Sequence, residues 1–468
     1  MNFAEIRFWG LLAAGLAVIA ALRFLLRPIL SGPRGDLFDR SALVLLGLTL
    51  LSFVSWITMT IFLVVALSSY LGLKWLLRHG RPRHRGFLLL LIPIQLLPLL
   101  YYKYAHFGLN EVLGFQFNTL RHLIIPVGIS FYTFQMVAFV IDTLGFRKPL
   151  PRFVDFLNFA GFFPQIVAGP IERRADLLPQ METFRFRWSS GDIDAGVSWI
   201  VVGMFFKLCL ADNVALQFYG RSADNAYLIW LDNLLFGLRI YYDFAGYSLV
   251  AVGLGRCLGI RLTLNFQSPY CSRNIAEFWR RWHITLSQWF RDYVYVPLGG
   301  GRTHRWVFNI AVVFIVSGIW HGAGWNFILW GAFHGTFLVV NRVLGPRVRI
   351  PNVAAWALTL VAALFAWLCF YEVRTDVLGV KLGALLTPSS YGAVALSEAL
   401  SARSGSDLFT ILCLLGLSGV VWFGEWWSVR KADEAYVCLR KPAVLIMMVV
   451  LTVFLAPGKN NAFIYFAF

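Results

Sequence analysis

The chain has 468 residues, of which 59% are hydrophobic and only 14% are charged, whereas soluble domains carry about 25% charged residues. So little polar surface excludes a soluble globular protein, and we expect an all-α protein with several membrane-spanning helices. The formal net charge of +17 does not indicate nucleic-acid binding, because the basic residues form short clusters between apolar runs, such as Arg173 with Arg174 and Arg430 with Lys431. Such clusters are typical of loops beside anionic headgroups, so membrane lipid is an expected partner and nucleic acid is not.

Apolar runs long enough for membrane helices occur along most of the chain, and we expect about ten to twelve transmembrane helices at roughly 20 residues each. The first run is interpreted as a membrane helix rather than a signal peptide, since it lacks a convincing cleavage site. The polar stretch 374–407 is interpreted as a surface loop with one short helix. No linker is visible, so a single integral-membrane domain is expected over 1–468. The runs lie at 8–26, 41–77 (two spans), 86–104, 122–143, 195–216, 228–259, 307–320, 323–341, 353–371, 408–427 and 442–457.

The stretch "GFFPQIVAGPIERR" at 161–174 cannot be a membrane helix. Pro164, Gly169 and Pro170 prevent a continuous helix there. Irregular backbone is tolerated at membrane depth only where protein or a water-filled cavity covers it. We therefore expect a packed core around a cavity, with re-entrant or interfacial helices beside the spans.

An unusually polar stretch, "FWRRWHITLSQWFRDYVYVPLGGG", occupies 278–301. Asn274 followed by Glu277 predicts a capped helix start, and "PLGGG" predicts the end. One continuous helix would carry its aromatic residues on one side and its polar residues on the other. Such a helix fits either the membrane interface or the wall of a water-filled chamber.

His283 is the candidate for proton transfer on this helix. Arg280 and Ser287 are its neighbours one turn away, and a nearby arginine lowers the pKa of an imidazole. The neutral form that results is the form that a general base needs. Asp292 lies on nearly the opposite side of an ideal helix, so it is better placed to brace Gln288, Arg281 or a residue elsewhere than to orient His283.

Two further histidines, His321 and His334, lie in the apolar region "VSGIWHGAGWNFILWGAFHG". A histidine within a membrane span is costly and by default indicates a functional site. His321 is the stronger candidate, because tryptophans flank it and the glycines that follow permit close backbone approach. His334 lies about 140° away on an ideal helix, so the two should not share a face. We interpret His334 as a core residue that ties helices together.

Other chemistries find no support in the sequence. It has no G-x-S-x-G, H-E-x-x-H or Walker motif and no paired carboxylates. The six cysteines are scattered without a C-x-x-C pair, so neither a metal site nor a disulfide framework is expected. Asp243 in "YYDFAGYS" is the most notable acid within a span, and it is either functional or paired with a buried arginine.

Five motifs together resemble the membrane-bound O-acyltransferases. They are "PVGISFYTFQ", "FPQIVAGPIERR", "YYDFAGYS", "FWRRWHITLSQWFRDYVYVPLGGGR" and "SGIWHGAGWNFILWGAFHG", in the order of the family. The likeness is strongest to the bacterial branch that acetylates alginate and is related to the D-alanine exporters of teichoic acid synthesis. The motif-bearing core covers about residues 120–345. The resemblance implies a multi-pass protein of the bacterial inner membrane, with its helices around a central funnel.

The resemblance also implies roles for individual residues. His321 is expected to be the general base that activates an acceptor hydroxyl. His283 and its arginine neighbours are expected to position a substrate and to stabilise charge on the carbonyl oxygen, so His283 and His321 are expected to pair across two elements. Substrate contacts are expected from Trp279, Arg280, Arg281, Ser287, Trp320 and Asn326, and structural roles from Asp243, Arg291 and Asp292.

The implied reaction takes an acetyl group from a cytoplasmic thioester, expected to be acetyl-CoA, for O-acetylation of an exported polysaccharide such as alginate or cellulose. No permanently bound cofactor is expected. Expected partners are a periplasmic SGNH-type acetyltransferase, other polysaccharide-modification proteins and a polysaccharide synthase complex. Two alternatives stay open: D-alanyl transfer to teichoic acid-type polymers, and a non-catalytic transporter of the acyl donor or the polymer.

Overall fold

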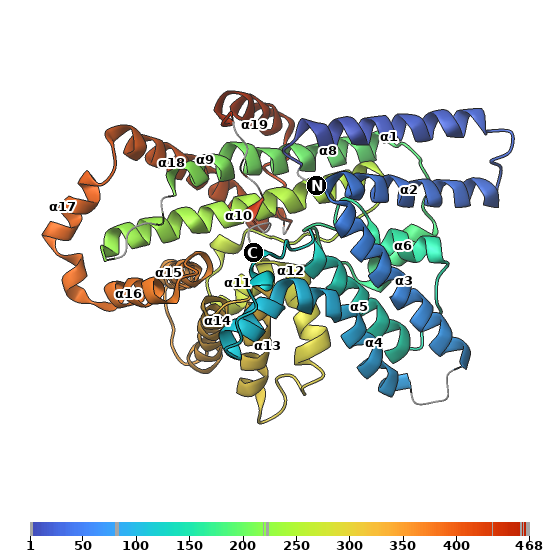
Figure 1. The fold of residues 1–468 in the computed structure, drawn as a ribbon. Coiled ribbons are helices and arrows are strands. Elements are labelled where there is room, and N and C mark those ends of the chain that lie inside the picture. The colour runs from blue at the N-terminus through green and yellow to red at the C-terminus, as the bar shows by residue number, and fades with distance from the viewer. Residues whose placement is uncertain are drawn as a thin grey trace. The chain divides into compact units, whose positions relative to one another are not determined.

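The computed structural model describes residues 3–79, 84–218, 220, 224–432, 434–458, 461 and 463–464, and these residues form helices and loops without a strand (Figure 1). The chain divides into two compact units. One comprises Met1–Ile200 and Tyr247–Thr263, and the other Val201–Gly246 and Leu264–Phe468. The helix α10 (Ala226–Cys257) belongs to both units, so the division does not separate consecutive domains, and the single domain stays a prediction.

The first unit is built from helices with one long irregular connection. The run 41–77 forms two helices, as expected, which part at Ser55. The run 122–143 is helical only from Ile129, because Gly128 has a φ of 75° and lies against the Ile166 carbonyl. The helices α1 and α2 lie side by side (Figure 1). The helices are α1 (Ile6–Leu25), α2 (Pro33–Val54), α3 (Trp56–His79), α4 (His84–Leu99), η1 (Leu100–Tyr104), η2 (Phe107–Val112), η3 (Asn118–His122), α5 (Ile129–Gly145), α6 (Phe153–Gly161), α7 (Arg174–Glu182) and α8 (Ser190–Met204).

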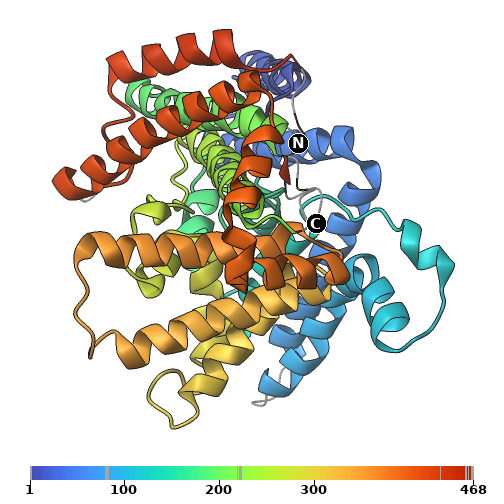
Figure 2. The ribbon, with the colours of Figure 1, turned by 90° about the vertical axis from the view of Figure 1, so that its left-hand side faces the viewer.

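The second unit contains the stretches rich in histidine and tryptophan. In it α13 and α14 lie side by side and α15 packs on α14 (Figure 2). Besides α10, its helices are η4 (Phe205–Ala211), α9 (Asp212–Gln217), η5 (Pro269–Cys271), α11 (Ile275–Arg281), α12 (Ile284–Phe290), η6 (Arg291–Tyr295), α13 (Trp306–His321), α14 (Trp325–Leu344), α15 (Asn352–Tyr371), α16 (Thr375–Leu386), η7 (Pro388–Tyr391), α17 (Ala393–Ser401), α18 (Gly405–Ala432) and α19 (Pro442–Leu455).

The stretch 374–407 is mostly helical, so its interpretation as a surface loop with one short helix was wrong. The helix α16 buries Leu378, Lys381 and Leu385, which recur at helical spacing. The Lys381 ammonium lies 2.9 Å from a carboxylate oxygen of Glu372, which anchors this helix. The serines and glycines of the stretch had suggested a loop, but the buried face decides the local structure.

Seven helices among the described residues are long and apolar enough to cross a membrane. Three shorter apolar helices, α5, α13 and α19, accompany them. Together they agree with the expected all-α protein of about ten to twelve spans, and the chain is a multi-pass membrane protein. The central funnel stays a prediction.

The irregular segment between α6 and α7 is buried, which confirms that protein covers it. Phe162, Gln165 and Glu172 in this segment are each no more than 2% exposed. The Gln135 side chain donates a hydrogen bond of 2.6 Å to the carbonyl of Phe159, near the end of α6. The Gln165 side chain in turn donates to the side-chain oxygen of Gln135 at 3.1 Å. Side-chain amides therefore satisfy backbone groups that an interrupted helix leaves open.

Glu172, at the end of this segment, should make the stability of the first unit depend on pH. Its carboxylate accepts hydrogen bonds from the amide and the hydroxyl of Thr263, but burial dominates and raises its pKa to about 7. The folded state therefore binds this proton more tightly than the unfolded state does, and stability falls as pH rises from about 4.5 to about 7. The loss amounts to no more than about 3 kcal/mol.

We expect Glu172→Gln to remove this pH dependence, because the amide keeps an acceptor for Thr263 and cannot ionise. The measurement is the melting temperature of the purified protein in detergent between about pH 5 and pH 8. The melting temperature of the wild type should be lower at about pH 8 than at about pH 5, and that of the variant should differ less between the two. Equal slopes for both proteins would contradict the assignment.

Candidate functional site

The polar stretch 278–301 is not one helix. Its start is as predicted: the Asn274 side chain accepts a hydrogen bond from the Glu277 amide at 2.8 Å, and Glu277 accepts one from the Arg273 amide at 2.9 Å. The helix α11 ends at Arg281, however, and α12 begins only at Ile284. The prediction of a continuous helix was therefore wrong.

The helix breaks at His283, which has a φ of 42° and a ψ of 56°. The strained conformation is held by Asn265, whose carbonyl accepts from the Ile284 amide at 2.9 Å and whose side chain accepts from the Thr285 hydroxyl at 2.6 Å. Tertiary hydrogen bonds thus replace helical ones at the break. The expectation that His283 and Asp292 lie on opposite sides of one helix therefore no longer applies, because no single helix contains both residues.

The His283 ring is fully buried among aromatic side chains. Its ring centroid lies 4.8 Å from that of Phe244, 6.0 Å from that of Trp320 and 6.4 Å from that of Phe266. His283 lies outside the spanning helices, and burial lowers its pKa to about 3. The imidazole is therefore neutral, as expected, but desolvation rather than a neighbouring arginine is the cause.

His321 is the last residue of α13 and is 3% exposed. A Cβ atom at Gly322 would lie 2.0 Å from the Phe327 ring, so a glycine there lets the chain turn tightly into α14. Because His321 and His334 lie on two helices, the 140° separation argued for one helix does not apply. Their ring centroids lie 4.9 Å and 4.7 Å from that of Trp330, so one indole contacts both histidines.

Trp320 links the two histidines on which the predicted chemistry depends. It is 3% exposed, and its ring centroid lies 6.0 Å from that of His283 and 4.9 Å from that of His321. Both imidazoles therefore belong to one aromatic cluster of the second unit. Their direct pairing stays a prediction.

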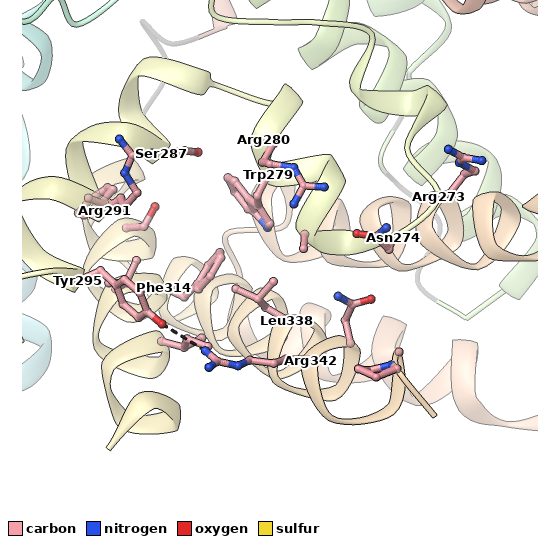
Figure 3. A pocket seen from close by; sticks show the side chains of 18 of the residues that line it. Arg273, Asn274, Trp279, Arg280, Ser287, Arg291, Tyr295, Phe314, Leu338 and Arg342 are labelled. Carbon is pink, nitrogen blue, oxygen red and sulfur yellow. Dashed lines mark hydrogen bonds between the residues drawn. The ribbon is translucent and has the colours of Figure 1, made fainter. Parts of the chain in front are cut away.

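A cavity of about 790 Å³ lies in the second unit beside this cluster. Four arginines from α11, its preceding loop, η6 and α14 surround it, and none of the described residues that line it is acidic. Arg342 is held in place, since it donates to the Gly301 carbonyl at 3.0 Å and to the Tyr295 hydroxyl at 3.4 Å. Figure 3 shows Arg280 and Trp279 entering from α11, opposite Arg342. The arginines are Arg273, Arg280, Arg291 and Arg342.

On both α13 and α14, the helix face that lines the cavity also carries a histidine. On α13, Phe314 and Ser317 line the cavity and His321 follows Ser317 by four residues. On α14, Leu338 lines the cavity and His334 precedes it by four residues. Residues four apart lie one turn apart on one helix face. Both lining faces therefore continue from the cavity to a histidine.

An aromatic layer lies between the cavity and His321. The Trp279 side chain lines the cavity, and its ring centroid is 5.0 Å from that of His334 and 5.7 Å from that of Trp330. Trp330 contacts His321 in turn. The rings of Trp279 and Trp330 thus lie between a ligand in the cavity and His321.

Four of the predicted residues line the cavity, namely Trp279, Arg280, Ser287 and Arg291. Among the described residues, Arg280 has no ion pair or hydrogen bond, so its guanidinium is available to a ligand. Asp292 lies 2.8 Å from the Arg291 guanidinium and braces that residue.

Two of the predicted substrate contacts are engaged in the fold. Arg281 pairs with Glu277 at 2.9 Å and donates to the Gln267 carbonyl at 3.2 Å. The buried Asn326 amide donates to the Cys369 carbonyl at 2.9 Å, between α14 and α15. Neither side chain lines the cavity.

Asp243 is paired, but with a lysine rather than with the arginine considered from the sequence. The Lys207 ammonium lies 2.9 Å from Asp243 and 2.8 Å from Asp212, and all three side chains are buried. Among the described residues, no three His, Cys, Asp or Glu side chains gather as ligands of a metal ion would.

Sequence reasoning missed three contributors to this site. Asn265 holds the break at His283, Trp330 contacts two histidines, and Arg342 closes the cavity. Arg342 follows His334 by eight residues, close to two helical turns, and that spacing is a signal that could have placed it on the same face. Nothing in the local sequence indicates the role of Asn265.

Comparison with known proteins gives consistent results. The model of the membrane-bound O-acyltransferase family matches residues 46–373. A "probable alginate O-acetylase" of Pseudomonas syringae pv. tomato is 34% identical over 76% of this chain and 70% of its own length. The corresponding protein of Pseudomonas aeruginosa is 37% identical over 66% of this chain and 62% of its own length.

A peptidoglycan O-acetyltransferase of Helicobacter pylori is 35% identical over 58% of this chain and 59% of its own length. The chain thus spans about two thirds of the length of the curated relatives that it matches. The match of the family model covers more than half of the chain and contains His283, His321 and every residue that lines the cavity. The chain belongs to the membrane-bound O-acyltransferase family.

Proposed function

We propose that this protein transfers an acetyl group from a cytoplasmic thioester, acetyl-CoA, for O-acetylation of an exported polysaccharide. The observation that carries the proposal is the arginine-lined cavity, whose walls continue along α13 and α14 to His321 and His334. The curated relatives named for O-acetylation of alginate and of peptidoglycan support the acetyl group and a polysaccharide acceptor.

The cavity supports a donor that carries phosphate groups. Guanidinium groups bind phosphate oxygens through paired, charge-assisted hydrogen bonds. Arg280 is free of other partners among the described residues, and no acid of the lining competes for it. In this proposal the phosphates of acetyl-CoA lie at the arginines, and the thioester end extends towards His321. Basic clusters favour the cytoplasmic side of a membrane protein, which agrees with a cytoplasmic donor.

His321 acts as the general base in this proposal. Its imidazole takes the proton of the acceptor hydroxyl, and the hydroxyl oxygen attacks the thioester carbonyl carbon. The carbon–sulfur bond then breaks, and the thiolate leaves with the proton that the imidazolium returns. His283, neutral because it is buried, donates a hydrogen bond to the carbonyl oxygen as negative charge develops there.

The acceptor lies on the other side of the bacterial inner membrane. Alginate and cellulose are candidate polysaccharides, and peptidoglycan joins them because of the Helicobacter pylori relative. A periplasmic SGNH-type acetyltransferase is the proposed partner that delivers the acetyl group, and a polysaccharide synthase complex supplies the polymer. Lipid surrounds the apolar helices.

The experiment that tests the donor site uses Arg280→Gln in protein purified into lipid nanodiscs. Loss of one charge-assisted contact should raise the KM for acetyl-CoA about tenfold and leave kcat nearly unchanged, since the phosphates are held alike in the ground and transition states. Acetyl transfer from labelled acetyl-CoA is the readout.

Arg347→Gln is the matched control, because Arg347 is exposed near the end of α14 and does not line the cavity. An unchanged KM in Arg280→Gln, or an equal rise in the control, would contradict the donor site. Activity with a D-alanyl carrier thioester instead of acetyl-CoA would identify the protein as a D-alanyl transferase. Passage of donor or polymer without transfer would identify a transporter.

A further inference from the structure

A buried lysine in the second unit contacts Asn461, which together with Phe463 and Ile464 is here called the strap. The Lys207 ammonium bridges two carboxylates, at 2.9 Å from Asp243 and 2.8 Å from Asp212, and also donates to the Asn461 carbonyl at 3.0 Å. The Ile464 amide donates to Asp243 at 2.7 Å. The strap therefore supplies an acceptor to the Lys207 ammonium and a donor to the Asp243 carboxylate.

The strap reaches the histidine at the helix break through two aromatic contacts. The ring centroid of Phe463 lies 6.0 Å from that of Phe244. Phe244, the residue after Asp243, lies 4.8 Å from His283 with its ring plane at 86° to the imidazole. Phe463 is 1% exposed and Phe244 and His283 are fully buried, so these three rings are packed in contact.

We propose that the strap is a positioning element for His283, held by Lys207 and Asp243 and acting through Phe463 and Phe244. The proposal rests on the proposed function in that it assigns His283 to acyl transfer. Asp243 and Lys207 are positioning residues in this account, since neither contacts a reacting atom.

A positioning role would explain why the chain keeps a cluster of charges that is costly to desolvate next to the strained backbone of His283. Three charged groups are buried at Lys207, and a buried ion pair contributes little net stability because each charge is desolvated. His283 has a left-handed backbone, which is strained for a non-glycine residue and persists only where the surroundings enforce it. Asn265 holds the backbone at this break, whereas Phe244 packs against the imidazole and fixes its orientation.

The test measures whether the strap protects His283, by modification of histidines with diethyl pyrocarbonate and mass spectrometry of the purified full-length protein. His283 should resist the reagent in the wild type and react at least about tenfold faster in Asp243→Asn and in Phe463→Ala, because local opening exposes it. His334 is the internal control, as it is fully buried in the same unit against other aromatic residues.

Asp232→Asn is the matched variant, since Asp232 pairs with Arg403 at 3.2 Å in a comparably buried ion pair of the same unit. It should leave His283 protected. Continued protection of His283 in both strap variants would overturn the proposal. Equal modification of His283 and His334 would also overturn it, since that result means general loosening.

Kinetics supply a second readout. Asp243→Asn and Phe463→Ala should each lower kcat about tenfold with little change in the KM for acetyl-CoA, and Phe463→Leu should restore most of the rate. The double variant should be no slower than the slower single variant, because both changes act through one strap. Effects that multiply would overturn the proposal. Histidine modification is measured without substrate. It therefore tests whether the strap positions His283 even if the wild type fails to transfer acetyl groups.

Discussion

Replacing His321 with asparagine should lower acetyl transfer about 1,000-fold, within the range of about 10²–10⁴ that a general base contributes. Asparagine can still form hydrogen bonds at this buried position but cannot accept a proton. The loss should fall on kcat, because the arginine cavity that binds the donor is unchanged. The measurement is the O-acetyl content of the exported polysaccharide in cells that produce equal amounts of wild type and variant.

His304→Asn is the matched control for this prediction, since His304 is an exposed histidine of the same unit, in the loop before α13. It should keep full activity. Elution of the His321→Asn variant as a single species in detergent shows that it has folded. Undiminished acetylation by a folded His321→Asn protein would refute the role of His321.

Gly318→Val should prevent recovery of folded protein. A Cβ atom at Gly318 would lie 2.2 Å from the Phe327 carbonyl oxygen, and one at Gly331 would lie 2.3 Å from that of Phe314. The two helices α13 and α14 therefore meet backbone to backbone, as small residues permit in membrane proteins. Since backbone atoms cannot move aside like side chains, the cost should exceed the ~3 kcal/mol of ordinary overpacking.

Separation of α13 from α14 would also displace both histidine-bearing faces. The measurement is the fraction of the variant that elutes as a monodisperse peak after extraction in mild detergent. Gly416→Val is the matched control, because nothing lies within 4 Å of a Cβ atom at Gly416 in α18, and it should be recovered like the wild type. Recovery of Gly318→Val equal to that of the wild type would mean that folding does not require the close packing of α13 against α14.

Most of the fold could be predicted from the sequence, because membrane helices are set by the length and apolarity of each run. The two helices within 41–77 and the irregular backbone at 161–174 followed from residues that are local to each stretch. At 374–407 only one short helix was expected, because the few buried residues of α16 lie among glycines and tertiary packing selects that helix.

The site could be predicted in part. His283 and His321 were found because histidines are rare in apolar surroundings, and Arg280 because it shares a stretch with His283. The break at His283 could not be found, since it depends on hydrogen bonds from Asn265, 18 residues earlier. The cavity needs arginines from α11, η6 and α14, and no local pattern shows that these segments meet.

In the proposed function, His321 is the general base for acetyl transfer from acetyl-CoA to the acceptor hydroxyl. The most direct measurement is the rate at which free CoA thiol appears when protein in nanodiscs meets acetyl-CoA, the isolated polysaccharide acceptor and the proposed periplasmic SGNH-type partner. We expect thiol release coupled one to one with polysaccharide acetylation by the wild type, and a rate about 1,000-fold lower for His321→Asn. Thiol release and acetylation at the wild-type rate in folded His321→Asn protein would contradict this role of His321.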